Sequence, residues 1–173
     1  MNYQIKFLLT ILLMPLFISC SNTEKVVIED KTYSALLIDD KLWMIEPINI
    51  NHKEGICFDN LEENCVNLGR LYNWETALAI DEAVVGWRLP TKTDIDTLRV
   101  YNEEWFEAIE PLGGWFYNHT KSFYGKNNYA FYWTSTLEGD SLAWNLFLNK
   151  DSDKQLIYPS NKNYYRSVIL IEE

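Results

Sequence analysis

Apolar residues along the chain predict short strands in its first and last thirds. Residues 33–38 and 42–45 are rich in aliphatic and aromatic side chains and flank a short acidic turn, so they predict a β-hairpin. Three later runs of similar composition predict strands over residues 129–136, 142–148 and 167–171. We expect polar loops over residues 118–128 and 149–163.

Helical periodicity occupies the middle of the chain. Within residues 69–81, apolar side chains recur at offsets 0, 3 and 7, which predicts one helix. A second helix should begin after Thr91, because Thr91 and Asp94 have the spacing of a capping box. Together these elements predict a single α+β domain over residues 31–173, with two helices packed on small antiparallel sheets and long loops.

The N-terminus has the pattern of a secretory signal. Residues 7–18 are almost entirely apolar, but twelve helical residues span only about 18 Å, which is too short to cross a bilayer. Cys20 follows this run directly and resembles the cysteine of a bacterial lipobox, although Phe17 stands where leucine is usual. We expect residues 1–19 to be a lipoprotein signal peptide and residues 20–30 to be a lipidated cysteine and tether. An ordinary signal peptide with an incidental cysteine is the alternative.

These features place the protein in the bacterial cell envelope. Acyl chains on Cys20 would make the membrane a partner, holding the domain at its surface without a spanning helix. No aspartate follows Cys20, which favours the outer membrane, with the periplasmic or external side left open.

Cys57 and Cys65 are the other two cysteines. In an exported protein their Cys-x7-Cys spacing predicts a structural disulfide. The alternatives are a pair of metal ligands or a redox-active dithiol, but zinc and redox motifs have shorter spacings between their cysteines.

Composition excludes several classes of protein. Apolar residues make up 47% of the 173 residues, which is enough for a packed core. A net charge of -10 argues against nucleic acid as a partner. The sequence lacks a Gly-x-Ser-x-Gly elbow and a phosphate-binding loop, so we expect no enzymatic activity, catalytic residue or cofactor.

Four segments resemble a known family in their order along the chain. They are Leu42-Trp43-Met44, the Cys57 to Cys65 loop running into Gly69-Arg70-Leu71-Tyr72-Asn73-Trp74, Gly86-Trp87-Arg88-Leu89-Pro90-Thr91, and Tyr132-Trp133-Thr134-Ser135-Thr136. All four are similar to segments of the Fibrobacter succinogenes major paralogous domain, and the Gly-Arg-Leu-Tyr-x-Trp and Gly-Trp-Arg-Leu-Pro-Thr blocks are the specific ones. The resemblance covers roughly residues 32–171 and implies a C-type-lectin-like fold related to formylglycine-generating enzymes, used mostly as a surface module of unestablished activity.

Departures from the family pattern add two expectations. A second disulfide is common in the family, but Ala83 and Leu170 stand near those positions here, so we expect an apolar contact between them. The calcium-binding motifs of C-type lectins are incomplete at Glu46-Pro47-Ile48 and Trp144-Asn145-Leu146, so we expect no bound metal.

Aromatic residues outside the family blocks form two clusters with asparagine. Tyrosine and asparagine on loops combine rigid contact area with adaptable hydrogen bonding, as binding loops do. The candidate ligand-binding residues are Trp115, Tyr117, Tyr124, Tyr129, Tyr158, Asn163 and Tyr164. The alternative is that these side chains only cover the edge of a sheet.

The sequence therefore predicts a lipid-anchored extracytoplasmic binding or adhesion module that contacts a surface protein or a glycan. A cell-wall or glycan-acting enzyme is one alternative, and it would need two carboxylates facing one cleft. A structural component of a surface assembly is another, favoured by a flat aromatic patch without a pocket.

Overall fold

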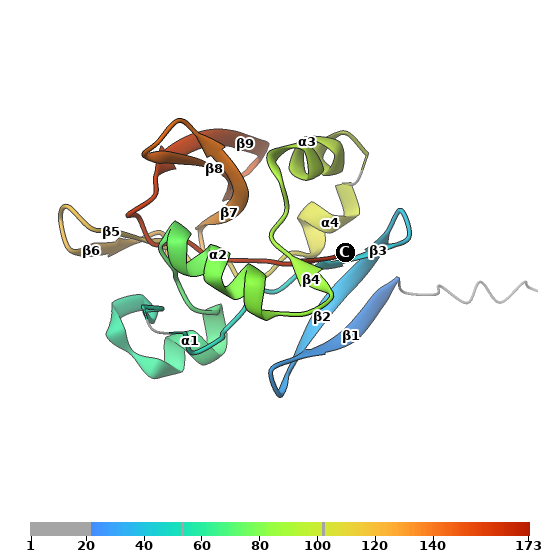
Figure 1. The fold of residues 1–173 in the computed structure, drawn as a ribbon, viewed down its shortest axis with the longest axis horizontal. Coiled ribbons are helices and arrows are strands. Elements are labelled where there is room, and N and C mark those ends of the chain that lie inside the picture. The colour runs from blue at the N-terminus through green and yellow to red at the C-terminus, as the bar shows by residue number, and fades with distance from the viewer. Residues whose placement is uncertain (1–21, 53, 102) are drawn as a thin grey trace, which may run out of the picture.

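The computed structural model describes residues 22–173, except residues 53 and 102. Over these residues the protein is α+β, with three antiparallel sheets and four α-helices (Figure 1). The strands are β1 (Thr23–Ile28), β2 (Lys31–Ile38), β3 (Lys41–Met44), β4 (Trp87–Arg88), β5 (Trp115–Tyr117), β6 (Ser122–Tyr124), β7 (Tyr129–Glu138), β8 (Leu142–Asn149), β9 (Ser152–Asn161) and β10 (Ile171–Glu172). The helices are α1 (Glu62–Leu68), α2 (Trp74–Ala83), α3 (Lys92–Tyr101) and α4 (Glu103–Ala108), and Phe58–Asn60 form a 3-10 turn.

The largest sheet has the strand order β1-β2-β3-β10-β4. The hairpin expected over residues 33–45 is confirmed as β2 and β3, joined by Asp39 and Asp40, which both have positive φ angles. A positive φ at both central residues matches the twist of a two-residue hairpin loop, and short polar side chains tolerate it best. Strand β1 pairs antiparallel with β2 from Lys31 to Leu36, so most of the segment assigned to the tether, Thr23–Ile28, instead forms an edge strand of the domain.

The two longer helices, α2 and α3, begin at capping residues. Thr91 caps α3 as expected: its Oγ1 accepts a hydrogen bond from Asp94 N at 3.1 Å, and Thr91 N donates to Asp94 Oδ2 at 2.7 Å. Helix α2 starts at Trp74, capped by Asn73, so the expected start at residue 69 is wrong. The expectation of two helices is also wrong, because α1 and α4 add two short helices.

The second sheet has the order β7-β8-β9. The strands expected over residues 129–136 and 142–148 are confirmed as β7 and β8. Residues 149–163, expected as a loop, contain the ten-residue strand β9. The last expected strand is shorter than predicted, although backbone hydrogen bonds from Met44 N to Leu170 O and from Ile48 N to Val168 O continue the pairing before β10.

The hydrophobic core joins the two larger sheets and the helices. Trp105 and Trp133 are completely buried, and each indole N–H donates to a backbone carbonyl, Trp105 to Met44 O and Trp133 to Tyr72 O. The chain thereby satisfies the polar atom of each large aromatic side chain inside the core. Val84 and Leu170 belong to this core, whereas Ala83 is exposed, so Val84 rather than Ala83 supplies the buried apolar residue of that segment.

The elements are arranged along one long axis. In Figure 1, the start of β1 and the turn between β2 and β3 lie at one end, and the β5–β6 hairpin projects at the other end. Within the described residues, no helix combines the length and the apolar character that crossing a bilayer requires.

Candidate functional site

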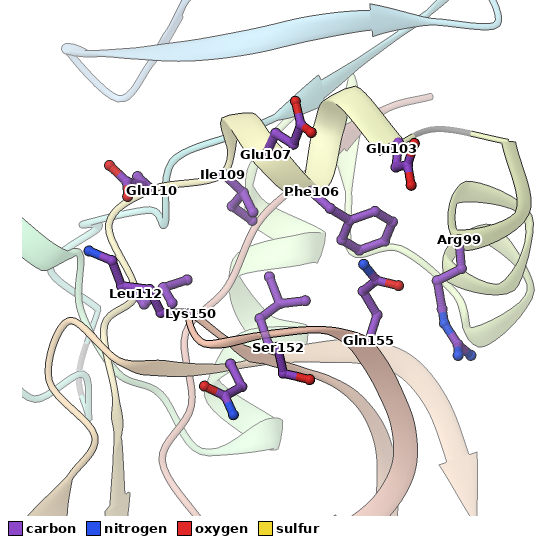
Figure 2. Close-up of a pocket in the computed structure, with 12 residues that line it drawn as sticks. Arg99, Glu103, Phe106, Glu107, Ile109, Glu110, Leu112, Lys150, Ser152 and Gln155 are labelled. Carbon is purple, nitrogen blue, oxygen red and sulfur yellow. The ribbon is translucent and has the colours of Figure 1, made fainter.

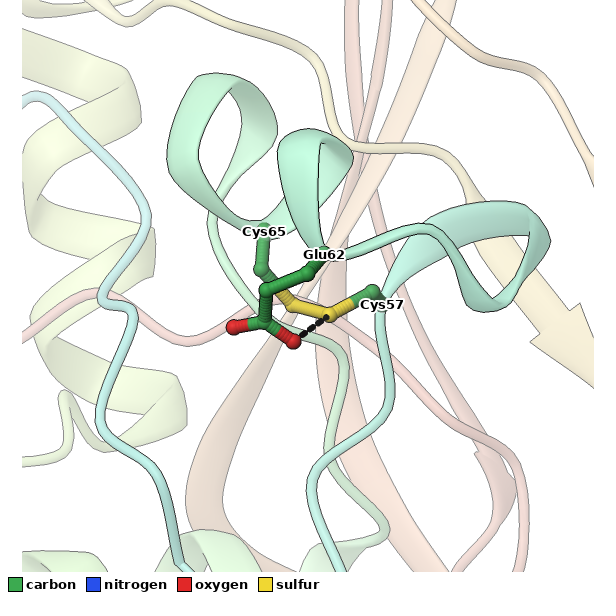
Figure 3. A group of neighbouring side chains, drawn as sticks. All are labelled: Cys57, Glu62 and Cys65. Atoms are coloured by element: carbon green, nitrogen blue, oxygen red, sulfur yellow. Dashed lines mark hydrogen bonds between the residues drawn. A yellow bond between two sulfur atoms is a disulfide. The ribbon is translucent and has the colours of Figure 1, made fainter.

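The disulfide between Cys57 and Cys65 is confirmed, with both cysteines buried and their Cα atoms 4.9 Å apart. Glu62 lies beside it, with Oε2 3.2 Å from Cys57 Sγ (Figure 3). These three residues are the one group of potential metal ligands in the described part of the chain. A cysteine binds zinc as a thiolate, and the disulfide leaves neither sulfur in that form, so this group is a structural bridge.

Six aromatic rings from five strands, β5 to β9, form a continuous aromatic stack. Trp115 lies at its centre, with ring centroids 5.6 Å from Tyr124 and 6.0 Å from Tyr129. Phe131 and Phe147 connect these rings to Tyr158, with Phe131 and Tyr158 6.0 Å apart. The aromatic stack is therefore Trp115, Tyr124, Tyr129, Phe131, Phe147 and Tyr158, and its members range from the buried Phe131 to Tyr124, which is 41% exposed.

A second aromatic contact joins β5 to the turn after β9. Phe116 and Tyr165 exchange two backbone hydrogen bonds, of 3.1 and 3.2 Å, which hold the two segments side by side. Tyr117 and Tyr164 face each other across this pair, with ring centroids 4.5 Å apart. Tyr164 donates a hydrogen bond to the Tyr117 hydroxyl at 2.8 Å. This bond raises the pKa of Tyr164, because the hydroxyl would lose the bond on deprotonation.

A cavity of about 290 Å³ opens beside this pair. The β5–β6 turn supplies three of its residues, and the end of β9 with its following turn supplies the other three. We call it the amide pocket, lined by Asn118, His119, Lys121, Asn161, Asn163 and Tyr164. Asn161 Oδ1 accepts a hydrogen bond from Asn163 N at 2.9 Å and fixes the second turn, as short amide side chains commonly do.

Arg166 connects the aromatic stack with the amide pocket. Its guanidinium carbon lies 3.8 Å from the centroid of Phe131 and 5.4 Å from that of Tyr164. Among the described residues, the Arg166 nitrogens Nε and Nη1 have no hydrogen-bond partner. The third nitrogen, Nη2, donates a hydrogen bond to Ser160 Oγ at 3.4 Å. Burial lowers the pKa of Arg166 to about 10, because the charged guanidinium is desolvated.

A larger cavity, of about 380 Å³, lies between α3, α4 and the turn that joins β8 to β9. Glu103, Glu107 and Glu110 line it, but Figure 2 shows Glu107 and Glu110 directed away from the residues across the cavity. Phe106 points toward Gln155 instead. The carboxylates therefore do not form the facing pair that glycoside hydrolysis uses.

The structure divides the predicted site residues into two groups. Asn163 and Tyr164 line the amide pocket, and Tyr117 contacts Tyr164. Trp115, Tyr124, Tyr129 and Tyr158 belong to the adjacent aromatic stack, whose rings pack mainly on one another.

Four further residues line the pocket that are not among the candidate ligand-binding residues, although they lie in the same two loops: Asn118, His119, Lys121 and Asn161. They lie beside predicted aromatic residues in the two turns. The composition of these turns, in which asparagine and lysine follow tyrosine, was the available signal.

No known protein family, curated protein or solved structure matches this chain. Cys20, the predicted lipidation site, lies outside the described residues. The function must therefore be inferred from the geometry of the site and from the motifs of the sequence.

Proposed function

We propose that this protein is a lipid-anchored, extracytoplasmic binding module with a C-type-lectin-like fold of the major paralogous domain type, and that it is not an enzyme. Cys20 carries the lipid, and the amide pocket with the adjoining aromatic stack contacts the ligand. The observation that carries the proposal is the meeting of two turns, far apart in the sequence, around one pocket of amides and an aromatic ring.

The chemistry of the pocket suits recognition. Tyr164 offers an apolar ring face, while the asparagine side chains offer both donors and acceptors within one small cavity. Such a combination holds a polar ligand by ring stacking and directional hydrogen bonds, and this binding requires no chemical reaction.

The position of the pocket supports the same function. The β5–β6 hairpin lies at the opposite end of the long axis from the start of β1 (Figure 1). A lipid attached three residues before β1 would therefore leave the pocket facing away from the bilayer. This is the orientation in which an anchored module meets a partner outside its own membrane.

A binding screen tests the proposed face. The full chain in non-ionic detergent would be applied to an array of envelope polysaccharides, oligosaccharides and purified surface proteins. We expect Tyr164→Ala to abolish the signal and Phe106→Ala to preserve it. Each change removes a half-buried ring that lines a cavity, so the pair is matched. Binding that survives Tyr164→Ala, or no binding by the folded chain, would refute the proposal.

Mass spectrometry tests the anchor. The mature protein should begin at an acylated Cys20 and sediment with membranes, whereas Cys20→Ser should leave it unacylated. An unmodified N-terminus at any other residue would remove the anchor from the proposal and leave the binding face untouched.

A further inference from the structure

We infer that the amide pocket recognises a carbohydrate bearing an acidic group, a carboxylate or a phosphate. The inference rests on the proposed binding function and names the ligand class of that same site. Three observations carry it: the charge of the lining, its hydrogen-bond donors, and the buried cation behind Tyr164.

The pocket is basic in an acidic protein. The chain has 25 acidic residues against 15 basic ones, yet the lining contains Lys121 and His119 and no carboxylate. Lys121 is exposed, and its Nζ donates a hydrogen bond to Asn118 Oδ1, which holds the ammonium at the rim of the pocket. A lysine in a pocket that has no carboxylate in its lining favours an anion by local electrostatics.

The neighbouring lysine does not take this role. Lys162 lies between two pocket residues in the sequence, but its Nζ is 3.9 Å from Glu75 Oε1 and 5.2 Å from the centroid of Trp74. Lys162 is therefore directed to α2, and Lys121 is the lysine that lines the pocket. This difference makes Lys121 the residue to test.

The other lining groups suit a sugar. Side-chain amides of Asn118, Asn161 and Asn163 can bond hydroxyl groups as donors and acceptors, and Tyr164 presents a ring for stacking. A cavity of about 290 Å³ is at the lower end of the usual range for ligand sites, which fits one or two sugar rings.

Arg166 reinforces the preference for an anion. Its guanidinium lies 5.4 Å from the ring of Tyr164 and forms no ion pair with any described residue. Its charge is balanced by aromatic faces instead of a carboxylate, so it still contributes a positive potential from behind the pocket wall.

Ligand-observed NMR titrations of the full chain in detergent test the inference. Galactose and glucose would each be compared with the corresponding uronate and 6-phosphate at about 0.15 M salt, where distant charges are screened. We expect about fivefold lower Kd for the acidic forms of at least one sugar. Lys121→Gln should reduce this ratio below about twofold. Lys150→Gln, an equal charge change at the other cavity, should leave it unchanged.

The outcomes separate the inference from the proposed function. Equal binding of neutral and acidic sugars, lost in Tyr164→Ala, would overturn the acidic preference and keep the binding face. An acidic preference that persists in Lys121→Gln would also overturn the inference. So would the absence of binding by any of these sugars at about 20 mM, roughly twentyfold above a weak Kd of about 1 mM. Comparing uronate with 6-phosphate identifies which acidic group the pocket prefers.

Discussion

Arg70 and Arg166 are both buried, yet the protein accommodates their charges in opposite ways. Arg70 donates hydrogen bonds to Asn49 Oδ1, Gly55 O and Glu62 Oε1, so each nitrogen has a partner and the charge has a carboxylate 2.7 Å away. Arg166 has one long hydrogen bond and three aromatic rings within 6 Å of its guanidinium carbon.

The difference indicates what each region does. A buried charge is costly unless it is paired, and the region around Arg70 meets that requirement entirely within the protein. Arg70 thus fastens the disulfide loop to the core. The region around Arg166 leaves donor capacity and positive potential next to the amide pocket, as expected where a ligand completes the interactions.

The largest expected effect concerns the disulfide in the Arg70 region. Replacing Cys57 and Cys65 together by serine opens a nine-residue loop, which costs about 2.6 kcal/mol in the chain-entropy model. Urea unfolding of the full chain at pH 7 measures this loss. Val66→Ser, an exposed change on the same helix, is the control and should be nearly neutral. A loss below about 1 kcal/mol would show that Arg70, and not the bridge, holds the loop.

The next effect separates the two arginines. Arg70→Met removes three hydrogen bonds while Glu62, which is 72% exposed, stays solvated. We expect a loss of about 2 kcal/mol in the free energy of unfolding, because Asn49 and Gly55 lose their donors. Glu62→Gln keeps an acceptor for Arg70 and should cost less than about 1 kcal/mol.

The smallest effect is expected at Arg166. Arg166→Met keeps the volume and the aromatic contacts of the side chain, and it removes a charge that has no carboxylate partner. The loss of cation–π attraction and the relief of desolvation should nearly cancel, leaving a change below about 1 kcal/mol. A cost equal to that of Arg70→Met in the same urea experiment would contradict the comparison.

The sequence predicts the fold best where a local signal determines the element. The β2–β3 hairpin and the start of α3 follow from turn and capping residues that act within four positions. Strand β9 was missed because it is polar and contains Pro159. Proline is tolerated there because β9 is an edge strand of its sheet, and strand order is a property of the whole fold.

The helix boundary at Trp74 shows a second limit. Leu71 has helical spacing with later apolar residues, but its N–H and C=O pair with Ile56 in an isolated bridge. Asn73 is the better signal, because its side chain caps the helix at Thr76 N. Periodicity identifies a face, and the competing tertiary hydrogen bonds decide where the helix begins.

The candidate site is predictable in composition but not in geometry. Tyrosine and asparagine in the two clusters indicated binding chemistry, and Asn163 and Tyr164 do line a pocket. Arg166 could not be selected from sequence, because its isolation from carboxylates depends on which rings surround it after folding. Lys121 likewise could not be selected, because it lines a pocket only when the β5–β6 turn lies beside the end of β9.

The position of β1 determines how far the proposed anchored module can reach. Only Ser21 and Asn22 separate Cys20 from Thr23, and two extended residues span about 7 Å. A lipid on Cys20 would therefore hold the domain close to the membrane surface, and the domain could sample only a small volume around its attachment point. Encounter with a partner would depend on the partner approaching to within one domain length of the bilayer, as at a contact between two closely apposed surfaces.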